Sequence, residues 1–173
     1  HIPFCVKKCA YCDFLSGPAG EKEKEEYVKM LVDEIRNCPD TVQNYRVISI
    51  FFGGGTPSLL TGEQIGRLMD TVREIFTLDE DAEITMEMNP GTVTEEKLRK
   101  YRQAGVNRLS IGLQSVNDEE LRLLGRIHTY EEFREAYHLA RANGFSNINV
   151  DLISAIPGQT VESWEKTLKQ VIA

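Results

Sequence analysis

Three cysteines near the start of the chain are the side chains with the clearest capacity for chemistry. Cys5, Cys9 and Cys12 have the spacing C-x3-C-x2-C within the stretch HIPFCVKKCAYCDF. Three thiolates can hold three of the four irons of a [4Fe–4S] cluster, one thiolate to each iron. The fourth iron is then left without a protein ligand, so it can accept a ligand from outside the chain.

An open iron of this kind can take an amine and a carboxylate, and the methionine part of S-adenosylmethionine supplies both. Electron transfer from the cluster into the sulfonium would cleave a C–S bond and give a carbon radical. The cofactors would bring this chemistry, and the protein would supply their position and electronic environment. The cysteine motif therefore predicts a binding site for S-adenosylmethionine and radical chemistry.

Two other kinds of site compete for the same cysteines. Zinc prefers four ligands and usually C-x2-C pairs, and this sequence has no second pair nearby. A thioredoxin-like pair at Cys9 and Cys12 would leave Cys5 unexplained. Cys38, which precedes Pro39 at the end of a predicted helix, is interpreted as an ordinary cysteine.

Two further stretches directly follow predicted strands. The run Gly53–Pro57 (GGGTP) contains three glycines, which let backbone N–H and C=O groups approach a ligand closely. In the next stretch, EMNPG, Glu87 ends a strand, where an inward carboxylate is costly unless it meets a donor or a cation. A surface position at the rim of the sheet is the alternative for Glu87.

Three more polar side chains lie at or beyond later strands. Gln114 ends the stretch LSIGLQ and offers both a donor and an acceptor. Arg126 follows in LGRIH, and Asp151 lies in the stretch DLI. From the residues alone, Arg126 and Asp151 could equally be structural, because an arginine and a carboxylate often only tie a loop.

Strand and helix patterns alternate along the chain, which predicts a parallel sheet with right-handed crossovers. The predicted strands are His1–Phe4, Arg46–Phe52, Glu83–Met88, Asn107–Ile111 and Asn147–Ile153. The predicted helices are Glu21–Asn37, one capped by Thr61, Thr94–Ala104, one from Thr129 to Asn143, and one opened by Thr160. A closed barrel of eight units needs about 250 residues. We therefore expect an α/β fold, a partial and open parallel (β/α) barrel truncated at both ends, with ligands at the carboxyl ends of its strands.

Composition narrows the choice of partner and compartment. The 173 residues suffice for one domain, and the formal net charge of −7 argues against nucleic acid as a partner. No apolar run approaches the ~18 residues of a membrane span. Clustered cysteines without an export signal indicate a reducing compartment, so we expect the cytoplasm.

The cysteine motif, with Tyr11 before its last cysteine, resembles the radical S-adenosylmethionine (radical SAM) superfamily. Within it, HIPFC and GGGTP resemble the oxygen-independent coproporphyrinogen III oxidase group, which includes the haem-chaperone branch HemW. The resemblance covers essentially the whole chain and implies that residues 1–173 form a radical SAM core domain without the family's C-terminal region. Family positions that contact S-adenosylmethionine match Tyr11, Gly54, Gly55, Thr56, Glu87, Gln114, Arg126 and Asp151.

The sequence departs from the oxidase at one motif position. The oxidase pattern continues C-x3-C-x2-C-x-C, but here Phe14 occupies the place of the fourth cysteine, and Asp13-Phe14 resembles the chaperone branch. The resemblance therefore implies a protein that binds haem for delivery, with oxidative decarboxylation to protoporphyrinogen IX as the alternative. It also implies porphyrin or haem as a partner and an electron donor such as flavodoxin or ferredoxin.

Overall fold

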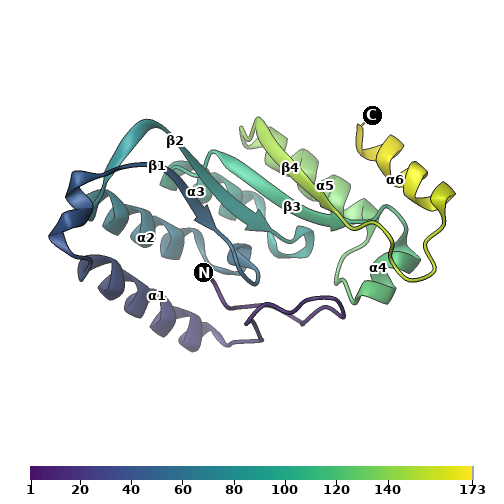
Figure 1. The fold of residues 1–173 in the computed structure, drawn as a ribbon, viewed down its shortest axis with the longest axis horizontal. Helices are drawn as coiled ribbons and strands as arrows, with labels where there is room; N and C mark the ends of the chain where they lie inside the picture. The colour runs from purple at the N-terminus through teal and green to yellow at the C-terminus, as the bar shows by residue number, and fades with distance from the viewer. Residues whose placement is uncertain (173) are drawn as a thin grey trace.

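The computed structural model describes residues 1–172 and contains a four-stranded sheet flanked by helices (Figure 1). The strands are β1 (Arg46–Phe52), β2 (Thr77–Met88), β3 (Arg108–Gln114) and β4 (Asn147–Leu152). They lie in the order β1–β2–β3–β4, and each neighbouring pair is parallel. The predicted parallel α/β architecture is therefore confirmed.

Within residues 1–172, six α-helices accompany the strands. They are α1 (Glu21–Arg36), α2 (Gly62–Ile75), α3 (Glu95–Ala104), α4 (Asp118–Leu124), α5 (Tyr130–Ala142) and α6 (Val161–Ile172). Short 3-10 helices cover Asp40–Asn44, Pro57–Leu59 and Pro90–Thr92. The helix starts predicted at Thr61 and Thr129 are confirmed. Both are capping boxes, in which the hydroxyl accepts a hydrogen bond from the backbone N–H three residues later. Among residues 1–172, no helix is both long enough and apolar enough to cross a membrane.

The prediction of a strand at His1–Phe4 is wrong. Ile2 and Phe4 instead form isolated parallel bridges with Gly54 and Gly17. The N–H of Ile2 donates to the C=O of Gly53 at 2.7 Å, so its partner is the loop that follows β1 rather than β1 itself. Gly54 has a φ of 118°, and a backbone turned in this way cannot continue a regular ladder. As a result, the segment that leads to Cys5 is hydrogen-bonded to the glycine-rich loop.

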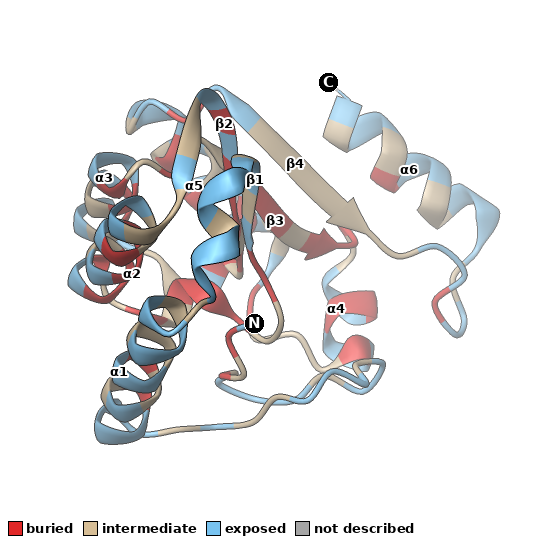
Figure 2. Ribbon diagram, turned by 60° about the vertical axis from the view of Figure 1, so that its left-hand side comes forward, coloured by how far each residue is buried: buried red, intermediate tan, exposed pale blue. Residues whose placement is uncertain are grey.

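The strand register separates apolar rows from polar rows across the sheet. One row joins Phe52, Met86, Leu109 and Ile148, all of which belong to or pack against the hydrophobic core. Because successive side chains of a strand point to opposite faces, the neighbouring row faces the other way. That row contains Glu87, Ser110 and Asn149. Figure 2 shows buried residues concentrated along β3 and on one side of α2 and α3.

Candidate cofactor site

A pocket of about 200 Å³ opens at the carboxyl ends of the strands, where parallel α/β sheets bind their ligands. Its walls come from the N-terminal segment, the loop after β1, and the ends of β2, β3 and β4. All eleven residues predicted for the site line this one pocket. They are Cys5, Cys9, Tyr11, Cys12, Gly54, Gly55, Thr56, Glu87, Gln114, Arg126 and Asp151.

Two backbone hydrogen bonds help to hold the loop that contains the three cysteines. The N–H of Cys5 donates to the C=O of Gly17 at 2.9 Å, and the N–H of Ala10 donates to the C=O of Leu124 at 2.9 Å. Both contacts join residues that are distant in sequence. All three thiols are free and partly exposed, so they are accessible as ligands. Figure 1 shows this purple segment passing from beside β1 to the region of α4.

The glycine-rich loop packs directly against the first cysteine. A Cβ on Gly55 would lie 2.6 Å from the carbonyl oxygen of Phe4 and 3.0 Å from the sulfur of Cys5, so only glycine fits without movement. The hydroxyl of Thr56 lies 3.6 Å from the same sulfur and donates to it. The loop therefore brings backbone groups close to a thiol, which is the close approach that the three glycines predict.

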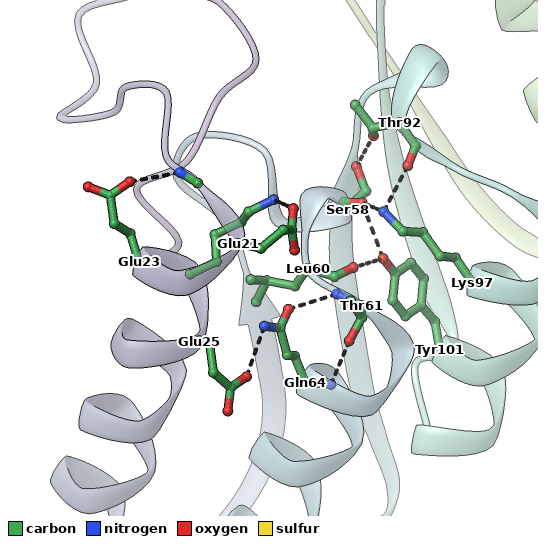
Figure 3. A network of polar contacts seen from close by, with 12 residues as sticks. Glu21, Glu23, Glu25, Ser58, Leu60, Thr61, Gln64, Thr92, Lys97 and Tyr101 are labelled. Carbon is green, nitrogen blue, oxygen red and sulfur yellow. Dashed lines mark hydrogen bonds and ion pairs between the residues drawn. The ribbon is translucent and has the colours of Figure 1, made fainter.

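Two side chains of α3 hold the loops that follow β1 and β2 (Figure 3). The ammonium of Lys97 donates to the C=O of Ser58 at 2.8 Å and to the C=O of Thr92 at 3.1 Å, one from each loop. The hydroxyls of Ser58 and Thr92 lie 2.6 Å apart and form a direct bond between the loops. The buried hydroxyl of Tyr101 donates to the C=O of Leu60 at 2.6 Å. Helix α3 thus fixes the spacing between the two loops that form adjacent walls of the pocket.

Two carboxylates face the pocket from β2 and β4, the strands on either side of β3. Burial raises the pKa of Glu87, the N–H of Gly54 opposes this by donating to its Oε2 at 3.0 Å, and the charge of Asp151 raises the pKa again. A cation between these two carboxylates would relieve both the desolvation and the repulsion. S-adenosylmethionine carries such positive charge on its ammonium and sulfonium, so the electrostatics of the pocket suit it.

Arg126 connects the cysteine loop with the end of β3. One guanidinium nitrogen donates to the C=O of Gly112 at 2.7 Å. The other lies 3.3 Å from the hydroxyl of Tyr11 and 3.8 Å from the sulfur of Cys9. Burial raises the pKa of the Tyr11 phenol, and the positive charge of Arg126 partly offsets that increase. The guanidinium therefore holds Cys9 and Tyr11 beside the end of β3.

The backbone of Gln114 is strained at the point where β3 ends. Its φ is +74°, a conformation that non-glycine residues rarely adopt, and its side chain is only 9% exposed. The register between β3 and β4 shifts between Gly112 and Gln114, which accompanies this turn. Strain of this kind costs about 1–3 kcal/mol and persists where the surrounding structure enforces it, often at ligand sites. The sequence pattern predicted Gln114 as a site residue but contains no signal for its backbone conformation.

Several pocket residues were missed by the sequence analysis. Lys7, Lys8, Phe14, Met88, Asn89, Ser110 and Gly112 also line the pocket. Ser110 could have been found, because it lies four residues before Gln114 on a strand of period two and therefore on the same face. Lys7, Lys8 and Phe14 could have been found as well, because they lie inside the cysteine loop itself.

The donor set fits the cofactors that the cysteine motif predicts. Three thiols lie on the rim of a pocket whose other walls offer backbone N–H groups, two carboxylates, an amide and a guanidinium. Thiolates are the ligands of iron–sulfur clusters, and the remaining groups match the charged and polar parts of S-adenosylmethionine. A mononuclear zinc site requires four ligands around one ion. Among residues 1–172, no three His, Cys, Asp or Glu side chains, the three cysteines included, are grouped closely enough to hold a single metal ion.

His128, which lies two residues after the pocket residue Arg126, makes the stability of the fold dependent on pH. Burial, and after it the nearby charge of Arg126, lower its pKa from 6.5 to about 4. The unfolded chain therefore binds a proton first as the pH falls below 6.5. The contribution of the neutral, buried imidazole to the stability of the fold is fully present above pH 6.5 and is lost progressively toward pH 4.

Between pH 7 and pH 5, we expect the free energy of unfolding of the original protein to fall by about 2 kcal/mol more than that of His128→Asn. Asparagine does not titrate, so the comparison removes the contribution of every other group. Urea unfolding at the two pH values measures the difference. Equal pH dependence in both proteins would contradict the buried, neutral state of His128.

A model of the radical SAM superfamily matches residues 1–171. The chain is 46% identical to the haem chaperone HemW of Escherichia coli, over 99% of this chain and 46% of that protein. It is 36% identical to the mitochondrial radical S-adenosyl methionine domain-containing protein 1 of Danio rerio, over 99% of this chain and 39% of that protein. The chain thus spans less than half the length of these relatives.

A solved structure agrees with both the fold and the sequence similarity. The structure of coproporphyrinogen III oxidase (HemN) from Escherichia coli, described as a radical SAM enzyme, superimposes with a TM-score of 0.90 at 38% identity. The match covers 99% of this chain and 40% of that one. The fold described above is therefore shared with the matched part of that structure.

Proposed function

Because the chain belongs to the radical SAM superfamily, we propose that Cys5, Cys9 and Cys12 bind a [4Fe–4S] cluster and that the adjoining pocket binds S-adenosylmethionine. Membership of this superfamily implies both cofactors. The observation that supports these particular residues is their meeting in one pocket, although they come from six separate parts of the chain. When bound, the two cofactors supply one-electron radical chemistry.

The pocket residues have distinct roles in this proposal. Glu87 accepts hydrogen bonds from the ammonium of the ligand, in addition to the bond it already accepts from Gly54. Gly55 and Thr56 present backbone groups beside Cys5, and Gln114 offers an amide to polar parts of the ligand. Tyr11 and Arg126 line the side of the pocket next to Cys9. Asp151 faces the ligand from the end of β4.

We further propose that the whole protein binds haem for delivery, as a chaperone of the HemW type. The 46% identity to the HemW of Escherichia coli supports this assignment. Phe14 supports it as well, because the side chain at this motif position lines the pocket and cannot act as a thiol ligand or donor. A protein of this kind also requires an electron donor such as flavodoxin or ferredoxin.

An oxygen-independent coproporphyrinogen III oxidase is the second candidate. The close superposition with HemN favours it, because the pocket lies on the same scaffold as in that enzyme. The two candidates differ in what the protein does with a porphyrin. A chaperone binds haem without changing it, whereas an oxidase decarboxylates coproporphyrinogen III.

Haem titration and turnover on the full-length, cluster-loaded protein separate the two functions. We expect stoichiometric haem binding, seen as a shifted Soret band, and no protoporphyrinogen from coproporphyrinogen III with S-adenosylmethionine and a reductant. Phe14→Cys serves as the matched variant, since it restores the fourth cysteine of the oxidase motif. Turnover by the original protein without haem binding would replace the chaperone with the oxidase.

A further inference from the structure

Asn149 lies in the same polar row of the sheet as two residues of the pocket wall. The register pairs Glu87 of β2 with Ser110 of β3, and Ser110 with Asn149 of β4. Asp151 follows Asn149 by two residues on the same strand, so both side chains lie on the face of the sheet that holds the pocket. Asn149 itself is not among the residues that line the pocket, although Ser110 and Asp151 are.

The side chains of Asn149 and Ser110 engage both oxygens of the Asp151 carboxylate. The amide of Asn149 donates to Oδ1 at 2.7 Å, and the hydroxyl of Ser110 donates to Oδ2 at 2.9 Å. The same amide also donates to the hydroxyl of Ser110 at 3.0 Å. These three bonds close a ring that fixes the rotation of the carboxylate about its Cβ–Cγ bond.

The donors that hold Asp151 are neutral. Within residues 1–172, no lysine or arginine forms an ion pair with this carboxylate. Its negative charge therefore remains available to a ligand, whereas an ion pair with an arginine would consume it. Asparagine is also a poor strand former, so a structural role alone would be better served by a β-branched residue at position 149.

We propose that Asn149 is a positioning residue, which orients the Asp151 carboxylate, through direct contact and through Ser110, toward S-adenosylmethionine. The inference rests on the proposed function of the pocket, because it requires Asp151 to contact that ligand. It adds a residue outside the pocket lining to the groups that determine affinity. The groups on Asp151 that a ligand can reach are acceptors, so ribose hydroxyls or the ammonium are the matching parts of the ligand.

A double-mutant cycle distinguishes positioning through Asp151 from a general structural effect. The variants are Asn149→Leu, which keeps the branched shape and removes the donor, Asp151→Asn, and the two combined. Calorimetry measures the dissociation constant for S-adenosylmethionine on the full-length, cluster-loaded protein, and iron content is measured for each variant. Asn147→Leu is the matched control, because this exposed asparagine lies two residues earlier on the same strand.

We expect Asn149→Leu to weaken binding about tenfold, the size expected when a bond to a charged group is lost. In the Asp151→Asn background the same change should alter the affinity less than about twofold, because the carboxylate it orients is gone. Iron content should stay constant, and Asn147→Leu should bind like the original protein. If Asn149→Leu does not fold, Asn149→Ala removes the same donor with a smaller side chain and completes the same cycle.

Two outcomes overturn the inference, and they differ in what else they imply. If Asn149→Leu weakens binding equally in both backgrounds, Asn149 does not act through Asp151, while the proposed function stands. If Asp151→Asn alone leaves the affinity unchanged, Asp151 does not contact the ligand, and its part in the proposed function fails together with the inference.

Discussion

Replacement of Cys5, Cys9 or Cys12 by serine is expected to abolish the iron–sulfur cluster in each case. Each thiolate serves a different iron, so none can substitute for another, and a hydroxyl is a poor replacement for the soft thiolate ligand. The three thiols line one pocket, and the sulfur of Cys5 also contacts Thr56. Iron and sulfide content after anaerobic reconstitution measures the result, and electron paramagnetic resonance of the reduced protein gives the cluster type.

Cys38→Ser is the matched control and should retain full cluster content. The sulfur of Cys38 lies 3.8 Å from the C=O of Glu34 and takes no part in the pocket. In the original protein, addition of S-adenosylmethionine should shift the resonance signal, because the ligand binds the iron that lacks a cysteine. Full iron content in any one of the three pocket variants, or stoichiometric zinc in the original protein, would refute the cluster assignment.

Local signals in the sequence predicted most of the fold. Thr61 and Thr129 cap their helices as the capping-box pattern indicates, and Gly105 ends α3 with a φ of 105°. The strand Arg46–Phe52 was predicted with the observed bounds. The wrong prediction of a strand at Ile2 and Phe4 has a physical reason. An apolar segment that pairs with a loop has the same local sequence pattern as one that pairs with another strand. Pairing depends on a partner distant in the sequence, which local patterns do not identify.

The site was predicted from residue types that are rare at strand ends, and this signal explains both its success and its gaps. The three clustered cysteines, two glycines of the triplet and Glu87 at a strand end stand out in a sequence, and they line the pocket. Asn149 and Ser110 do not stand out, because polar residues alternate along any half-exposed strand. Their significance appears only when the register places them beside Asp151. Lys97 likewise has the sequence appearance of a surface lysine, yet it joins two loops of the site.

Replacement of Glu87 by glutamine is expected to weaken the binding of S-adenosylmethionine by one to two orders of magnitude and to leave the cluster intact. A hydrogen bond to a charged group contributes about 1.5–3 kcal/mol, and glutamine removes the charge while it keeps the shape. Glu87 forms a hydrogen bond with Gly54 and with none of the three cysteines. The iron content should therefore not change. Glu83→Gln is the control, because it removes an exposed carboxylate from the same strand and face.

The raised pKa of Glu87 gives this prediction a second, independent signature. Burial keeps the carboxyl group protonated to a higher pH than an ordinary glutamate, and the charge of Asp151 acts in the same direction. A cationic ligand favours the carboxylate, so binding should release protons, and the affinity should fall as the pH decreases through the raised pKa. Calorimetry in buffers of different ionisation enthalpy counts the released protons. Glu87→Gln should lose this proton release. If Glu87→Gln binds weakly but releases as many protons as the original protein, the titrating group is not Glu87.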